Sequence, residues 1–557
     1  MNAPTFNSRR SPVYGRNGIV ATSQPLATAA GLEILARGGN AADAAIAAAA
    51  ALNVTEPTST GIGGDMFALY FDSDSRRVTA LNGSGRAPSD LSRDRLKRED
   101  LLADELPPFH AHTVTVPGAC AGWCDLHARH GSLPLSNILA PAIKLAEEGF
   151  PVAPITAHFW SRGVDRQLRS APNGHELTIE GRAPKAGELF RNPGLARTFK
   201  AVAEKGKAAF YESEIAEAIV NVIRESGGCM KLDDLAAHTS TWEEPISVDY
   251  RGLRVYECPP NGQGITALIA LNILEGFDLA GLDSLSPEKL HLMIESLRLA
   301  FADARWYVSD PAFNNLPIAQ LLSKDYAVQR RNLINTQYAT RNTQFDSPTS
   351  FSNTIYLSVV DGMGNACSFI NSNYMGFGTG IVPKGWGFTL QNRGHNFSLD
   401  PNHPNCLAPR KRPYHTIIPA MVTRVPRAER RASEVEAQGE GETLFASYGV
   451  MGGFMQPQGH VQVLSALHDA GLDPQSALDL PRFCIEAEKS GGEVAIEEGI
   501  PQATFDQLGK MGHPVRWVSG YERALFGRGQ VILRDAETGV LCAGSDPRAD
   551  GCAMTLG

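Results

Sequence analysis

Thr354 lies where a polar segment of the chain meets a β-rich run, a position at which a threonine hydroxyl could act as a nucleophile. The hydroxyl is a weak nucleophile unless a neighbouring base accepts its proton. If the chain were cut before Thr354, the new α-amine, with a pKa of about 7.7–8.0, would supply that base. Threonine is also frequent in strands, so the position alone favours a structural residue over a catalytic one.

Two other patterns are typical of ligand sites, but neither is complete. The glycine turn GIGGD at 61–65 lacks the Lys and Ser/Thr of a phosphate-binding loop. Cys120 and Cys124 lie one helical turn apart, but no second pair or nearby His completes a metal site. The nine cysteines are scattered and odd in number, which favours free buried thiols over a disulfide framework. We therefore expect no metal and no cofactor.

The segments on either side of Thr354 differ in character. Residues 85–330 have mainly helical patterns, and 330–353 are rich in Asn, Thr, Gln and Ser, which predicts an exposed linker. Residues 354–371 read as a β-hairpin, two β-rich runs around an Asp-Gly turn. The sequence thus predicts a helix-rich N-terminal part and a strand-rich C-terminal part that meet at Thr354.

Periodicity and turn-forming residues locate the other elements. Helices are expected at 25–37, 41–52, 134–149, 215–226, 287–307 and 458–470, and strands at 19–22, 66–71, 387–390, 417–422 and 444–448. Asn40 is placed to cap the second of these helices. Residues 424–442 form a charged insertion that we interpret as a disordered surface loop.

Composition excludes several classes of function. The chain has 557 residues, 43% of them hydrophobic and 20% charged, which is ordinary for a soluble globular protein of several domain-sized units or one interwoven domain. The net charge of -9, without clustered Lys and Arg, argues against nucleic-acid binding. The chain has no apolar run of about eighteen residues and no apolar leader, so we expect no membrane span and a cytoplasmic location.

Seven short motifs occur along the chain in a fixed order. They are GGNAADA at 38–44, GIGGD at 61–65, VPG at 116–118, ADAR at 302–305, GFGTG at 376–380, MGG at 451–453 and PRF at 481–483. Through them the chain resembles the γ-glutamyltranspeptidase family over about residues 18–555. The resemblance implies an α+β N-terminal-nucleophile fold, a four-layer αββα sandwich with a helix-rich N-terminal subunit and a strand-rich C-terminal subunit.

The resemblance also implies a precursor that cuts itself between Asn353 and Thr354. The Thr354 hydroxyl would attack the Asn353 carbonyl, and water would open the resulting ester. The products would be a large subunit, 1–353, which ends in the linker 330–353, and a small catalytic subunit, 354–557. The two subunits are expected to stay together as one interwoven domain.

The family also implies roles for groups around the nucleophile. Ser372 matches the hydroxyl residue that hydrogen-bonds the nucleophile. Gly452 and Gly453 match the pair whose backbone N–H groups form an oxyanion hole, a feature that contributes about 3–4 kcal/mol per donor. These glycines are also typical of a turn that starts a helix, and both interpretations are compatible.

The positions that recognise a glutamyl α-amine depart from the family pattern. The acidic position is Asn396, which cannot neutralise an ammonium group. The Glu/Gln position before it is Arg393, which would repel one. Arg393 can therefore be a ligand for an anionic acyl group or a structural arginine.

The remaining substrate positions differ as well. The carboxylate-binding arginine aligns with Ser84, and Arg86, two residues on, is its candidate substitute. The paired serines of the family are His415 and Thr416, and an asparagine position is Tyr374. His415 can orient an acyl group or fill the wall of the site, and Tyr374 is expected to be wall. These changes resemble the branch with cephalosporin-acylase-like proteins and oxamate amidohydrolase.

Three hypotheses follow. The leading one is a self-processing threonine amidohydrolase or acyltransferase that acts on γ-glutamyl amides such as glutathione through an acyl-Thr354 intermediate. The alternative is an acylase or oxamate-type amidohydrolase for small anionic amides that lack an α-amine, held by Arg86 and Arg393 together. A third, of another class, is an inert binding protein, against which the retention of Thr354, Ser372 and the glycine pair argues.

Overall fold

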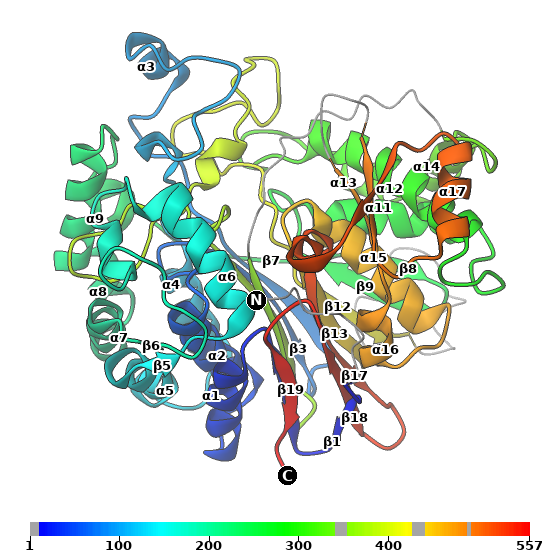
Figure 1. Cartoon of the computed structure of the whole chain (residues 1–557), viewed down its shortest axis with the longest axis horizontal. Coiled ribbons are helices and arrows are strands. Elements are labelled where there is room, and N and C mark those ends of the chain that lie inside the picture. The colour runs from blue at the N-terminus through cyan, green and yellow to red at the C-terminus, as the bar shows by residue number, and fades with distance from the viewer. Residues whose placement is uncertain (1–9, 340–353, 426–440, 487–491) are drawn as a thin grey trace.

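The computed structural model describes residues 10–339, 354–425, 441–486 and 492–557. Within them, two seven-stranded antiparallel sheets pack face to face, and helices lie on the outer side of each sheet (Figure 1). The predicted α+β, four-layer αββα sandwich is confirmed. Asn353, most of the predicted linker and most of the charged insertion lie outside the described residues.

The first sheet carries the predicted hairpin near its centre. Its strands follow the order β19 (Cys552–Thr555), β2 (Gly18–Thr22), β10 (Ile355–Asp361), β11 (Ala366–Ser372), β3 (Asp65–Asp72), β4 (Arg77–Gly83) and β7 (Thr241–Glu243). Strands β10 and β11 are antiparallel, with Ile355 opposite Asn371. This register places Thr354, just before β10, beside Ser372 at the end of β11.

The second sheet also combines strands from both sides of Thr354. Its order is β1 (Val13–Gly15), β18 (Leu541–Ser545), β17 (Arg528–Arg534), β13 (Thr443–Met451), β12 (Ala420–Arg424), β9 (Leu253–Glu257) and β8 (Ile246–Tyr250). Buried apolar side chains such as Phe67, Tyr356 and Ile532 form the core between the sheets. The two predicted subunits therefore share both sheets and that core.

The helical layers come from different parts of the chain. On the side of the first sheet lie α1 (Pro25–Ala36), α2 (Ala41–Thr55), α4 (Ala119–His130), α5 (Leu135–Glu148) and α7 (Pro193–Lys205). On the side of the second lie α11 (Gly264–Leu274), α12 (Pro287–Tyr307), α15 (Met455–His468) and α16 (Pro474–Asp479). As predicted, Asn40 caps α2, since its side chain accepts hydrogen bonds from the N–H groups of Ala42 and Asp43.

Smaller elements surround these layers. The further α-helices of the described residues are α3 (Arg93–Arg98), α6 (Pro154–Gly163), α8 (Lys207–Tyr211), α9 (Glu214–Glu225), α10 (Leu232–Ala236), α13 (Ile318–Leu321), α14 (Lys324–Arg331) and α17 (Gln502–Lys510). A π-helix, Val164–Leu168, follows α6 directly. Short sheets are formed by β14 (Phe483–Ile485), β15 (Val494–Glu497) and β16 (Val515–Val518), and by β5 (Phe150–Pro151) and β6 (Leu189–Phe190). No helix in the described ranges is both long and apolar enough to cross a membrane.

The prediction of a strand at 387–390 is wrong. These residues belong to no sheet, and the N–H of Leu390 instead donates to the carbonyl of Ile381, 2.9 Å away. Gly380 and Gly387 have φ values of +78° and +69°, in the left-handed region that interrupts regular strand pairing. The short apolar run therefore forms a loop wall against the first sheet's helices rather than another strand.

Candidate active site

Thr354 is fully buried at the start of β10, in the middle of the first sheet. Its Oγ1 donates a hydrogen bond to Ser372 Oγ, 3.1 Å away at the end of β11. One hairpin thus brings together the predicted nucleophile and its predicted hydroxyl partner. Their catalytic roles stay predictions, and Asn353 is outside the described residues.

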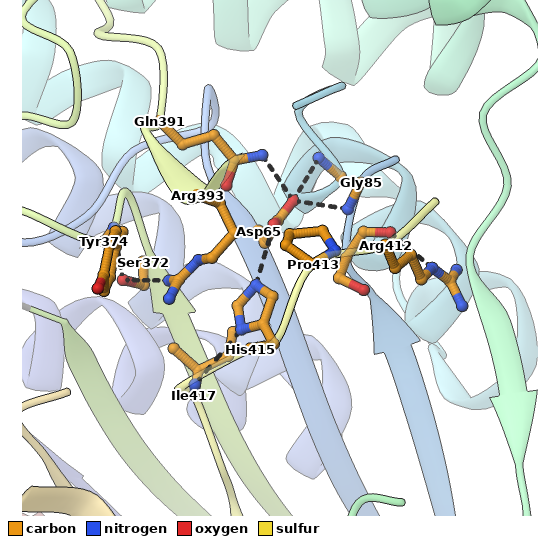
Figure 2. Close-up of polar contacts among 12 residues, drawn as sticks. Asp65, Gly85, Ser372, Tyr374, Gln391, Arg393, Arg412, Pro413, His415 and Ile417 are labelled. Carbon is orange, nitrogen blue, oxygen red and sulfur yellow. Dashed lines mark hydrogen bonds and ion pairs between the residues drawn. The ribbon is translucent and has the colours of Figure 1, made fainter. Parts of the chain in front are cut away.

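Ser372 is the point on which other groups of the site converge. Its Oγ accepts hydrogen bonds from the backbone N–H of Tyr374 at 2.8 Å and from Nη2 of Arg393 at 3.1 Å (Figure 2). A guanidinium one hydrogen bond away from Ser372 favours the development of negative charge on Thr354 Oγ1. The sequence predicted that Arg393 would lie near the α-amine of a glutamyl substrate. In the structure, Arg393 lies next to Ser372, the hydrogen-bond partner of the predicted nucleophile.

Arg393 is held rigidly and carries a buried charge. It begins the 3-10 helix Arg393–Asn396, is fully buried, and donates from Nη1 to Thr416 Oγ1 at 2.7 Å. Burial lowers the pKa of its guanidinium to about 10, against the opposing effect of the Asp65 carboxylate, so the group is cationic at neutral pH. Its Nε has no hydrogen-bond partner, and no carboxylate among the described residues forms an ion pair with it.

Tyr374 packs against Arg393, and its role as a wall of the substrate site stays a prediction. It is fully buried, and the Arg393 guanidinium carbon lies 4.4 Å from the centre of its ring. Its φ of +77° is unusual for a bulky residue and turns its N–H toward Ser372. Strain of this kind persists where surrounding contacts impose it, and here the contacts are those of the candidate site.

His415 pairs with a buried carboxylate, Asp65. His415 Nε2 donates to Asp65 Oδ2 at 3.0 Å, and Nδ1 accepts from the N–H of Ile417 at 3.4 Å (Figure 2). Burial, reinforced by the charge of Arg393, lowers the pKa of His415 to about 4, although Asp65 opposes the shift. The imidazole is therefore neutral, with its proton on Nε2.

Asp65 is the site residue that the sequence interpretation missed. Its Oδ1 accepts from the N–H groups of Gly85 and Gly118 and from Gln391 Nε2, at 3.0, 3.1 and 2.9 Å. Burial alone would raise the pKa of Asp65. The hydrogen bond and electrostatic interaction with His415, followed by the charge of Arg393 and the hydrogen bond from Gln391, hold that pKa below its usual value. One feature of the sequence could have identified Asp65 as a site residue. Asp65 directly follows two glycines and begins a mostly apolar strand.

Among the described residues, no hydrogen bond joins Arg86 or Asn396 to Arg393, although Asn396 ends the same 3-10 helix. Arg86 Nη1 contacts the carbonyl of Thr239 at 3.5 Å, on the side where Arg412 also lies. Asn396 Nδ2 donates to the carbonyl of Tyr414 at 3.1 Å. Arg86 and Arg393 thus have different protein partners, and the clamp of two arginines around a substrate stays a prediction.

Gly452 and Gly453 form the turn between β13 and α15. Their φ values are +133° and +60°, and the Gly453 carbonyl accepts from Gln263 Nε2 at 2.9 Å. Gln263 Nε2 also contacts the carbonyl of Thr416 at 2.7 Å, which ties the turn to the residue that binds Arg393. In the part of the chain that the structure describes, neither glycine N–H donates to a protein acceptor, as an oxyanion hole requires.

One group of described side chains could hold a metal ion, and it lies apart from these contacts. His291 and Glu295 on α12 and His513 after α17 are buried close together. His291 Nδ1 and His513 Nε2 are already hydrogen-bonded at 2.7 Å, and Arg298 contacts Glu295 at 3.3 Å. The side chains of this cluster thus bond to one another and to Arg298. None of their described contacts reaches the residues around Thr354.

The chain is similar to known proteins along nearly its whole length. Residues 27–556 match the family model described as Gamma-glutamyltranspeptidase. The chain is 37% identical to the glutathione hydrolase-like YwrD proenzyme of Bacillus subtilis, covering 98% of this chain and 99% of that protein. It is 33% identical to the acylase ACY 1 proenzyme of a Pseudomonas strain, covering 92% and 91%.

A solved structure is similar over the whole chain. The crystal structure of cephalosporin acylase from Bacillus halodurans superimposes with a TM-score of 0.89 at 45% identity, covering 100% of this chain and 99% of that one. The predicted family, with its resemblance to acylases, is confirmed, as is the assignment to a family of hydrolases.

Proposed function

The chain belongs to the Gamma-glutamyltranspeptidase family of hydrolases, and from this premise we propose that it is a self-processing threonine amidohydrolase for small amides whose acyl group bears a carboxylate but no α-amine. One observation carries the proposal. Arg393 is a buried guanidinium without an ion-pair partner among the described residues, and it lies one hydrogen bond from Ser372. A buried charge of this kind is stabilised by an anion from the substrate.

The chain's own residues account for both chemical stages. In self-processing, Thr354 Oγ1 attacks the Asn353 carbonyl carbon, the peptide nitrogen leaves as the α-amine of Thr354, and water hydrolyses the ester. In turnover, that amine accepts the hydroxyl proton while Oγ1 bonds to the acyl carbon of the substrate. The substrate amine leaves with a proton, and water then hydrolyses acyl-Thr354. The N–H groups of Gly452 and Gly453 would stabilise the oxyanion in both stages.

An α-amine on the acyl group has no partner in this arrangement. Asp65 is the carboxylate of the site, and its two oxygens are already occupied by His415, Gln391 and two backbone N–H groups. His415 is neutral, and Arg393 repels an ammonium group. These contacts favour an acyl group such as glutaryl over γ-glutamyl.

A γ-glutamyl hydrolase or transferase acting on glutathione-like donors is the second candidate. The observation that favours it is the 37% identity, over nearly the whole chain, to a protein described as glutathione hydrolase-like. The two candidates differ in one substrate group, the α-amine.

A comparison of two anilides separates the candidates. We expect glutaryl anilide to be turned over with a higher kcat/KM than γ-glutamyl anilide, and Arg393→Gln to lower the glutaryl value by about 10- to 100-fold. Arg86→Gln is the matched control, because its side chain contacts Thr239 instead of Ser372. A preference for the γ-glutamyl anilide would refute the acyl assignment. A protein that stays as one band on a denaturing gel, as Thr354→Ala should, would refute the enzyme itself.

A further inference from the structure

An open cavity of about 440 Å³ lies beside α6 and the π-helix that follows it. Its lining includes Phe159, Arg162, Arg166, Gln167 and Phe377. A volume of this order holds a drug-sized molecule. Such a molecule would meet two cationic side chains, two aromatic rings and the carboxylate of Asp165.

The first wall of the cavity is continuous with the candidate site. Gln167 Nε2 donates to the carbonyls of Met375 and Gly378, both at 2.6 Å, and Gln167 Oε1 accepts from the N–H of Phe377 at 3.3 Å. These bonds fix the π-helix to the loop that begins at Tyr374, the residue that contacts Ser372. π-Helical turns are rare and are frequent at functional sites.

A second lining residue, Phe159, contacts the segment next to the glycine turn. The Arg528 guanidinium carbon lies 5.4 Å from the centre of the Phe159 ring, and Gly527 directly precedes Arg528. A methyl group on Gly452 would lie 3.2 Å from Gly527 Cα. The cavity is therefore lined by the loop that follows Tyr374, and its Phe159 is linked through Arg528 and Gly527 to the turn at Gly452.

The charges around the cavity do not cancel. Arg162 pairs with Glu522 at 2.8 Å, and Asp165 pairs with Arg169 at 2.6 Å. Arg166 has no carboxylate partner among the described residues, and its guanidinium carbon lies 5.2 Å from the Phe109 ring centre. One cation is thus left over, exposed at the cavity and bordering a second cavity of about 340 Å³.

We propose that this cavity binds the amine part of the substrate, and that Arg166 recognises a carboxylate on it while Phe159 and Phe377 contact its apolar body. The proposed function assigns the acyl group to the buried Arg393, so the leaving amine needs an open side from which it reaches solvent. The substrate class is then an amide of an apolar or aromatic amine that carries a carboxylate. The inference rests on the proposed function only in that Thr354 cleaves an amide.

Two matched amines test the site without turnover. Nitroaniline and the same nitroaniline with a ring carboxylate are titrated into the mature protein by calorimetry. We expect the carboxylated amine to bind wild type more tightly, by about tenfold, since a hydrogen bond between charged groups is stronger than a neutral one and solvent partly screens Arg166. Arg166→Gln should abolish this preference, and Arg166→Glu should reverse it. Arg37→Gln, on the outer face of α1, removes the same charge elsewhere and should retain the preference.

Nitroaniline and its carboxylated form are then compared as the leaving groups of two anilides that share the same acyl group. The kcat/KM ratio, carboxylated over plain, should fall by about tenfold in Arg166→Gln, mainly through KM. Equal binding of both amines to wild type, or a preference that survives Arg166→Glu, would overturn the proposal. Failure of the acyl assignment would appear differently, as a preference for γ-glutamyl with the amine preference intact.

Discussion

At the scale of single residues, the site depends on charges that are buried together. Arg393, His415 and Asp65 are fully buried, and burial is the largest influence on the pKa of each, modified by the charges and hydrogen bonds of their neighbours. Asp65 keeps its charge through its donors, Arg393 keeps its charge beside the nucleophile, and His415 stays neutral between them. Sequence comparison could mark Arg393 and His415 as departures from the family, but only folding reveals that they meet Asp65, which lies 350 positions from His415.

His415 gives the protein a predicted dependence on pH. The folded-state pKa of about 4 lies below the usual 6.5, so the unfolded state binds its proton first as the pH falls. The stabilisation is therefore complete above about pH 6.5 and is lost between pH 6.5 and 4, by up to ~3 kcal/mol. Urea unfolding of wild type and His415→Asn across this range measures it, because the asparagine amide can still donate to Asp65 but does not titrate. Parallel pH profiles for the two proteins would contradict the assignment.

At the scale of elements, regular structure was predictable and the loops around the site were not. The helix expected at 287–307 forms with those bounds, and the hairpin at 354–371 forms with the predicted turn, because apolar periodicity and an Asp-Gly turn specify both. The strand expected at 387–390 does not form, since its first residue, Gly387, and Gly380 before it adopt left-handed φ values. The Asp65 contacts join segments that no local pattern connects.

The turn that follows β13 yields a prediction at this scale. Gly452 has a φ of +133°, which is accessible essentially to glycine alone, and a side chain there would meet Gly527. We expect Gly452→Ala to lower kcat by about 100-fold or more, because the two N–H groups would turn away from the oxyanion. Gly499→Ala is the control, since its φ is +109° but a methyl group meets only ordinary contacts at 3.5 Å. If both variants lose similar thermal stability but only Gly452→Ala loses kcat, the result supports the oxyanion-binding role of the turn. Equal kcat values in the two variants would exclude that role.

At the scale of the whole molecule, the fold explains how a cut chain could remain one protein. Strands β10 and β11, which follow Thr354, lie between β2 and β3, which precede it. In the second sheet, β9, which precedes Thr354, pairs with β12, which follows it. Cleavage before Thr354 breaks none of the strand pairings that the structure describes and leaves the shared core in place. We therefore expect the native mass of the cleaved protein to equal that of the uncut Thr354→Ala variant by light scattering.

The same interweaving predicts how the two forms refold. The uncut Thr354→Ala chain can rebuild both sheets within one molecule, so its refolding rate after urea dilution should not depend on protein concentration. The mature protein must bring two fragments together before β10 can pair with β2 and β11 with β3, so its refolding should contain a step that accelerates in proportion to concentration. Intrinsic fluorescence followed over about a tenfold range of concentration distinguishes the two. Concentration-independent refolding of the cleaved protein would mean that one fragment folds its sheet alone, which the alternation of strands from both fragments argues against.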